Sequence, residues 1–295
     1  MMKLLFELVR NRLRILGEIR SDRQRTWTPV FEESSGRKLS APSQWLCAIT
    51  DIGRRRSNNE DGYFLSTDCR LWIVTDGMGG HAAGEIASAL TIEAIVDSFA
   101  TTNAGTRETV EGDAGPRLIA AFAVAQERVS GRSQNDLECH GMGSTAIAGF
   151  VIGEVLHLCH VGDTRAYHLS DGQFRRLTND HSLVWELVMS GLLTADQARL
   201  HPQRSTITQA IGMLTGVQPA VTSLQLKPGD RVLLCSDGLW EALAEHDIAQ
   251  IVGSVGSMLE LASILVDKAK TLSGQDNITA VLYEHGCGPH IMAEG

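Results

Sequence analysis

From residue 45 onward, the chain alternates short apolar runs with acidic or glycine-containing turns, which is typical of strands in a packed sheet. Four longer stretches have helical character instead. Because strands and helices come in blocks without strict alternation, the pattern predicts an α+β fold with mainly antiparallel pairing. The predicted strands are 45–50, 71–75, 145–152, 155–161, 165–169, 174–177, 221–226, 231–235 and 278–283, and the predicted helices are 82–99, 117–129, 181–190 and 258–271.

The first 44 residues have a different pattern. Leucines and valine at near-helical spacing alternate with arginines up to about residue 20, and residues 21–44 are mostly polar with Pro29 and Pro42 as breakers. A basic amphipathic helix of this kind either packs on its own domain or contacts a partner or an anionic membrane surface. We therefore expect an N-terminal helix and linker (1–44), a folded domain (45–285) and a C-terminal tail (286–295).

Composition narrows the class of protein. The chain has 295 residues, of which 43% are hydrophobic, and a formal net charge of -9. These values predict a full buried core and argue against nucleic-acid binding, which needs an excess of Lys and Arg. The six cysteines include no C-x-x-C pair, so we interpret them as buried thiols in a reducing cytoplasm. No apolar run is long enough for a secretory signal or a membrane span.

Aspartates stand at the ends of several predicted strands. Asp76, Asp163 and Asp237 follow apolar runs, Asp276 precedes the last one, and neighbouring glycines allow close backbone approach to a ligand. A single Asp-Gly pair is more typical of a turn. If these strand ends converge, however, the clustered carboxylates raise one another's pKa and need a compensating cation. An all-oxygen ligand set favours Mg²⁺ or Mn²⁺ over zinc.

A second charged cluster opens the folded region, where three arginines at 54–56 precede Glu60 and Asp61. This segment is either a solvated loop or a site in which one arginine binds a phosphate and the acids hold metals or their waters. Together with the strand-end aspartates, the second interpretation indicates phosphoryl chemistry.

Seven ordered motifs over residues 45–285 resemble one family. The chain is similar to the metal-dependent serine/threonine protein phosphatases of type 2C, in their bacterial branch. The motifs are Asp51-x-Gly53-x-x-Arg56-x-x-Asn59-Glu60-Asp61, Asp76-Gly77-Met78-Gly79-Gly80-His81, Gly143-Ser144-Thr145-Ala146, Gly162-Asp163-Thr164-Arg165, Leu177-Thr178-x-Asp180-His181-Ser182-Leu183, Ser236-Asp237-Gly238 and Asp276-Asn277-Ile278-Thr279.

The resemblance implies a fold of two packed antiparallel sheets flanked by helices on both outer faces, with a two-metal site at one end. It implies that Arg56 binds the substrate phosphate and that His81 is the general acid for the leaving oxygen. The ions are Mn²⁺ or Mg²⁺, two of them tightly bound. The implied metal ligands are Asp76, the Gly77 carbonyl, Asp237 and Asp276, with Glu60 and Asp61 holding metals or their waters and Asp163 helping to bind a third, weaker ion.

The resemblance also implies an activity, which is hydrolysis of phosphoserine and phosphothreonine in proteins by a metal-bridging water. Phosphorylated proteins are then the substrates, and a cognate Ser/Thr kinase is the expected partner. A non-catalytic module of the same fold that binds a phosphoprotein or kinase remains an alternative. A second alternative is a thiolate mechanism, because Cys159 and Arg165 match the C-x5-R spacing of cysteine-dependent phosphatases.

Overall fold

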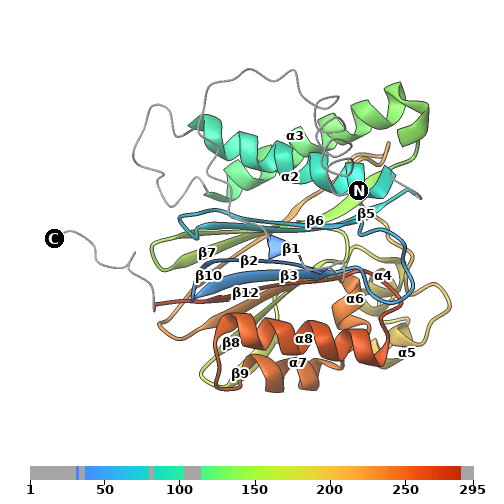
Figure 1. Cartoon of the computed structure of the whole chain (residues 1–295). Helices are drawn as coiled ribbons and strands as arrows, with labels where there is room; N and C mark the ends of the chain where they lie inside the picture. Colours follow the sequence, from blue (N-terminus) through green and yellow to red (C-terminus); the bar gives the residue numbers. More distant parts are fainter. Residues whose placement is uncertain (1–30, 33–36, 80–82, 103–113, 287–295) are drawn as a thin grey trace, which may run out of the picture.

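The computed structural model describes residues 31–32, 37–79, 83–102 and 114–286. Within these residues, two antiparallel sheets stack face to face (Figure 1). The seven-stranded sheet has the order β1 (Phe31–Glu32), β2 (Arg37–Ser43), β3 (Leu46–Asp51), β12 (Ile278–Glu284), β11 (Arg231–Cys235), β8 (Arg165–Ser170) and β9 (Gln173–Arg176). The five-stranded sheet has the order β10 (Ala220–Gln225), β7 (Val155–Val161), β6 (Gly143–Ile152), β5 (Leu71–Met78) and β4 (Asp61–Leu65).

Helices cover both outer faces of the sandwich (Figure 1). The pair α2 (Ala83–Thr102) and α3 (Ala114–Asn135) packs on the five-stranded sheet, and α7 (Glu245–Val252) and α8 (Met258–Leu272) pack on the other. The short helices α4 (Leu183–Met189), α5 (Ala195–Arg199) and α6 (Asp237–Trp240) and the 3-10 turn η2 (Leu137–Cys139) lie in the connections. The predicted α+β sandwich is therefore confirmed.

Three apolar cores hold these layers together. One lies between α2–α3 and the five-stranded sheet, and a second lies between α6–α8 and the seven-stranded sheet. The third lies between the sheets, where Trp72 from one sheet and Leu234 from the other are completely buried. Burial of apolar area on this scale is the main favourable term in folding, so both sheets are rigid supports for what their ends carry.

All nine predicted strands and all four predicted helices are present, with small shifts at their ends. The turn at residues 171–172 joins β8 to β9, and both Asp171 (φ 51°) and Gly172 (φ 75°) are left-handed, as a type I′ hairpin turn requires. The sequence analysis missed β4, α5, α6 and α7. The first three are only four or five residues long and show too little periodicity to be recognised.

The prediction of a linker up to residue 44 was wrong for its last part. Residues 37–43 form β2 and pair with β3, for example Lys38 with Thr50. In β2 only Ser40 is fully buried, so the strand carries almost no hydrophobic signal. The sheet therefore begins before the predicted domain start at residue 45.

The predicted helix at the N-terminus and nearly all of the tail lie outside the described residues. In the part of the chain described, no helix combines the length and apolar character that a membrane span requires.

Strand register brings the predicted acidic residues to one end of the sandwich. The first residue of β8, Arg165, pairs with the last residue of β11, Cys235, and Ile278 at the start of β12 pairs with Asp51 at the end of β3. The aspartates just beyond these strand ends therefore leave the seven-stranded sheet at the same edge. In the five-stranded sheet Asp61 lies directly opposite Asp76.

Candidate metal centre

Five aspartates converge where the two sheets end. Burial raises the pKa of Asp76 well above its ordinary value, and the nearby carboxylates of Asp61, Asp237, Asp163 and Asp276 raise it further. Asp61 and Asp76 belong to the five-stranded sheet and Asp163 follows its strand β7, whereas Asp237 and Asp276 flank strands of the other sheet. The convergence expected from the sequence is therefore present.

Two of these carboxylates are held without enough compensation. The Oδ1 atom of Asp237 is buried and has no hydrogen-bond partner among the described residues. Burial, followed by the neighbouring carboxylates of Asp163 and Asp276, raises the pKa of Asp237 well above its ordinary value. Asp163 is only 5% exposed, and burial together with nearby Asp180 raises its pKa to about 7. An unpartnered buried carboxylate oxygen among like charges is costly, and a cation would relieve that cost.

Asp61 links the two sheets by hydrogen bonds. Its Oδ2 atom accepts hydrogen bonds from the hydroxyls of Ser236 (2.7 Å) and Thr279 (2.6 Å), both in the seven-stranded sheet region. These bonds favour the charged form, but burial outweighs them and raises the pKa of Asp61 to about 7. Neither hydroxyl was singled out from the sequence, although both flank predicted aspartates.

Glu60 and Gly77 are packed against the start of α2. The carbonyl oxygen of Glu60 accepts hydrogen bonds from the Gly77 amide (3.1 Å) and the Ser88 hydroxyl (2.6 Å). A Cβ atom on Gly77 would collide with the carbonyl oxygen of Gly84, and one on Gly84 would lie 2.8 Å from Glu60 Oε2. Glycine is needed at both positions because backbone and carboxylate approach so closely there.

Asn277 organises the loops around the aspartates, a role the sequence analysis did not assign. Its side-chain amide donates hydrogen bonds to the carbonyl oxygens of Ile52 and Asn58 (both 3.0 Å), and its Oδ1 atom accepts one from the Glu60 amide (2.8 Å). A Cβ atom on Gly238 would collide with the carbonyl oxygen of Asn277. The loop before Glu60 and the starts of α6 and β12 are therefore locked together.

Arg56 lies at the exposed side of the cluster. Its side chain is 46% exposed, and its Nη2 atom forms an ion pair with Asp276 Oδ2 at 2.6 Å. The guanidinium is thus close to the carboxylates and still accessible from solvent, as a phosphate-binding group requires. The predicted general acid, His81, lies outside the described residues.

The thiolate alternative does not agree with the geometry. Cys159 is completely buried in strand β7, and burial raises the pKa of its thiol to about 12. Arg165 is the first residue of β8, and it forms an ion pair with Asp180 at 2.6 Å. A reactive cysteine needs a lowered pKa and access, and Cys159 has neither.

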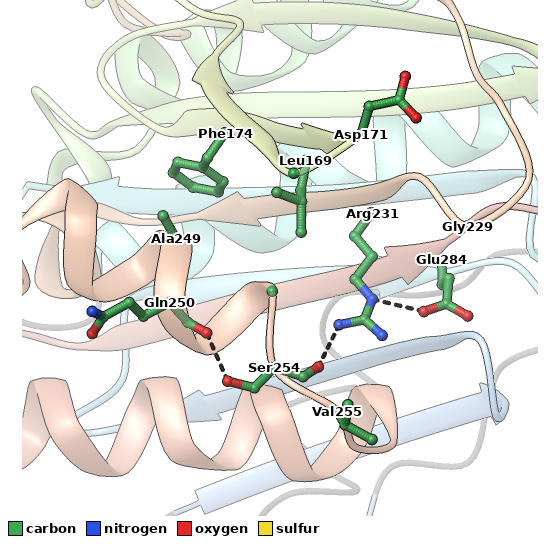
Figure 2. A pocket seen from close by; sticks show the side chains of 12 residues that line it. Leu169, Asp171, Phe174, Gly229, Arg231, Ala249, Gln250, Ser254, Val255 and Glu284 are labelled. Carbon is green, nitrogen blue, oxygen red and sulfur yellow. Dashed lines mark hydrogen bonds and ion pairs between the residues drawn. The ribbon is translucent and has the colours of Figure 1, made fainter.

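A separate surface cavity of about 600 Å³ lies between the β8–β9 hairpin and α7 (Figure 2). None of the five aspartates lines it. Its charged side chains have partners, because Arg231 pairs with Glu284 (2.7 Å) and Asp171 pairs with Lys227 (2.5 Å). The carboxylate cluster is therefore the stronger candidate for a functional site.

The cluster fits a divalent cation by its chemistry. Among the described residues, no three His, Cys, Asp or Glu side chains already stand in a metal-binding arrangement. The donor set nevertheless consists of oxygen atoms, the free Oδ1 of Asp237 has no other partner, and charge repulsion raises the pKa of the central carboxylates. Hard cations such as Mg²⁺ and Mn²⁺ prefer oxygen ligands, would give the Asp237 Oδ1 atom a partner and would offset the repulsion between the carboxylates. Asp276 currently forms an ion pair with Arg56, so a cation there would compete with the guanidinium for its charge.

Comparisons with known proteins agree with this site. The family profile described as protein phosphatase 2C matches residues 53–275. The serine/threonine protein phosphatase PstP of Mycobacterium tuberculosis is 36% identical over 253 residues, which cover 83% of this chain and 47% of that protein. The chain thus spans about half the length of that relative. The serine/threonine phosphatase stp of Listeria monocytogenes is 34% identical over 239 residues, covering 80% of this chain and 93% of that protein.

Solved structures show the same relationship. A crystal structure of the catalytic domain of PstP in complex with two manganese ions has a TM-score of 0.71 and 33% sequence identity to this chain. The matched region covers 81% of this chain and 96% of that catalytic domain.

Proposed function

The chain belongs to the protein phosphatase 2C family, and we propose that it is a metal-dependent hydrolase of phosphoserine and phosphothreonine in proteins. The observation that carries this proposal is the convergence of five aspartates beside a solvent-accessible arginine. A cation-binding carboxylate cluster next to a phosphate-binding group is what phosphoryl transfer requires.

Each residue of the cluster then has a defined task. Asp76, the Gly77 carbonyl, Asp237 and Asp276 would hold two divalent ions, while Glu60 and Asp61 would bind them or orient their waters. When bound, such ions supply positive charge against the phosphoryl oxygens and lower the pKa of water. Arg56 would exchange its ion pair with Asp276 for two hydrogen bonds to the substrate phosphate. His81 would donate a proton to the departing serine or threonine oxygen.

We also propose a third, weaker ion at Asp163. Its carboxylate is buried, lies beside the central cluster and has a pKa of about 7, so a further cation would stabilise its charged form. Either Mn²⁺ or Mg²⁺ suits an all-oxygen site.

The test is phosphate release from a phosphothreonine peptide by the purified full chain, with Mn²⁺, with Mg²⁺ and with EDTA. We expect turnover that needs the metal and disappears in EDTA. Turnover that survives EDTA would contradict the metal-dependent mechanism. A folded, metal-binding protein without turnover under any condition would support the non-catalytic binding module instead.

Replacing Arg56 tests its role in substrate binding. At saturating Mn²⁺, Arg56→Ala should raise the KM for the phosphopeptide at least about tenfold, because a charge-assisted bidentate contact contributes about 1.5–3 kcal/mol. Its exposed neighbour Arg55 serves as the matched control, and Arg55→Ala should leave the KM nearly unchanged. An unchanged KM in Arg56→Ala would remove Arg56 from phosphate binding.

Three broader assignments complete the proposal. Phosphorylated proteins are the substrates, a cognate Ser/Thr kinase is the opposing enzyme, and the location is cytoplasmic. The five described cysteines are free thiols, which supports a reducing compartment.

Contact of residues 1–20 with anionic membranes is tested by liposome co-sedimentation of the full chain against a version that starts at residue 31. That starting point keeps β2 in the sheet, and equal sedimentation of the two proteins would remove the idea.

A further inference from the structure

Trp240 connects two of the loops that carry the aspartates. It lies at the end of α6, the one-turn helix that begins at Asp237. Its indole Nε1–H donates a hydrogen bond to the backbone carbonyl oxygen of Asp163 at 3.0 Å. The Trp240 side chain therefore joins α6, which begins at Asp237, to the turn that contains Asp163.

The indole ring is itself held from its other side. The guanidinium carbon of Arg165 lies 3.4 Å from the centre of the Trp240 ring, which is close cation–π stacking. Arg165 in turn donates to both carboxylate oxygens of Asp180, with Nε–Oδ1 at 3.0 Å and Nη2–Oδ2 at 2.6 Å. The Arg165 and Asp180 side chains are only 12% and 5% exposed, so this support is rigid.

The two aspartates need such a connection because they reach the site from different sheets. Asp163 follows β7 of the five-stranded sheet, and Asp237 follows β11 of the seven-stranded sheet. Both side chains are carboxylates, which repel each other when charged. In the absence of a cation, this repulsion favours separation of the two loops.

We propose that Trp240 is a positioning residue that holds the Asp163 turn against α6 and so keeps Asp163 and Asp237 close enough for cation binding. This inference rests on the proposed function, because it assumes that the aspartates bind divalent ions. Trp240 acts through the backbone carbonyl of Asp163 and supplies no oxygen ligand of its own.

Trp185 offers a matched control within the same chain. It lies on α4 and stacks on Arg176, whose guanidinium carbon is 4.0 Å from the ring centre, while Arg176 Nη1 lies 3.6 Å from the same Asp180 carboxylate. Its indole nitrogen, however, has no hydrogen-bond partner in the part of the chain that the structure describes. Trp240→Phe and Trp185→Phe thus make the same chemical change to an arginine-stacked ring, but only the first removes a bond to an aspartate loop.

The experiment measures Mn²⁺ binding to the full-length chain from the electron paramagnetic resonance signal of free Mn²⁺, without any substrate. We expect Trp240→Phe to weaken binding about five- to tenfold, since loss of one part-buried hydrogen bond changes an equilibrium by about that factor. Trp185→Phe should bind like the wild type. Phosphatase turnover of Trp240→Phe should recover as Mn²⁺ is raised, with little change in the KM for phosphopeptide.

Other results would overturn the inference. Wild-type affinity in Trp240→Phe, or equal weakening in both variants, would show that the indole bond does not position the aspartates. If Trp240→Phe does not fold, the wild type labelled with ¹⁵N-tryptophan gives a second measurement, in which Mg²⁺ should shift the Trp240 indole signal more than that of Trp185. Equal shifts would contradict the proposal. A wild type that binds no Mn²⁺ would overturn the proposed function and this inference with it.

Discussion

Asp237→Asn is expected to abolish metal-dependent phosphate release and, at the same time, to stabilise the metal-free protein. Asparagine has nearly the same shape but cannot supply the charge that holds a divalent ion. Metal ions contribute several kcal/mol of transition-state stabilisation, so turnover at saturating Mn²⁺ should fall at least about a hundredfold. In EDTA the melting temperature should rise, because the buried, mutually repelling Asp237 carboxylate is removed.

The opposite signs of the two effects make this prediction sharp. Asp247→Asn is the control. Asp247 lies on α7, outside the carboxylate cluster, and the hydrogen bond that it accepts from Lys268 lowers its pKa. That variant should keep full turnover and melt at a slightly lower temperature. Near-normal turnover in folded Asp237→Asn would show that Asp237 does not bind a catalytic metal.

The metal-free protein should become more stable as the pH falls from 8 to 6.5. The pKa values of Asp61 and Asp163 are about 7 in the folded protein, against about 3.9 for an unfolded aspartate, so the folded state binds more protons in this range. Two such groups contribute about 1.5 kcal/mol between these pH values, or roughly 4 °C in melting temperature.

This pH range is chosen because histidines act in the opposite direction below it. Burial lowers the pKa of His181 to about 4, so protonation of the unfolded chain destabilises the fold below about pH 6.5. Melting curves in EDTA, with a parallel series in excess Mn²⁺, measure the effect. The Mn²⁺ series should lose the trend, because bound cations keep the carboxylates charged. A melting temperature that falls between pH 8 and 6.5 in EDTA would contradict the raised pKa values.

The strand-end aspartates could be predicted because each follows or precedes an apolar run that fixes its place in a sheet. Periodicity alone indicated that Asp76, Asp163, Asp237 and Asp276 leave strands at their ends. That these ends meet on one side required register, which for β8 and β11 pairs Arg165 with Cys235 across a large separation in sequence. The family resemblance predicted that these strand ends meet, and the structure shows that they do.

The supporting groups could not be predicted, because their partners are distant in sequence. The hydroxyls of Ser236 and Thr279 bond to Asp61 from 175 and 218 positions away. From the sequence, Trp240 cannot be distinguished from a core residue. The hydrogen bond from its indole N–H to the Asp163 carbonyl oxygen is visible only in the structure. Strand β2 was missed for a different reason, since its pairing depends on backbone hydrogen bonds and not on a buried face.

The tie between Asp61 and the opposite sheet changes what kind of strand β4 is. Within the described part of the chain, β4 is the outermost strand of its sheet, with β5 as its single hydrogen-bonded neighbour, and outermost strands ordinarily fray and tolerate slippage. The two hydroxyl bonds to Asp61 anchor its first residue across the sandwich. An acidic residue on the border of one sheet is thereby fixed to the other sheet, so the outermost strand can carry a residue whose position in the site must be exact.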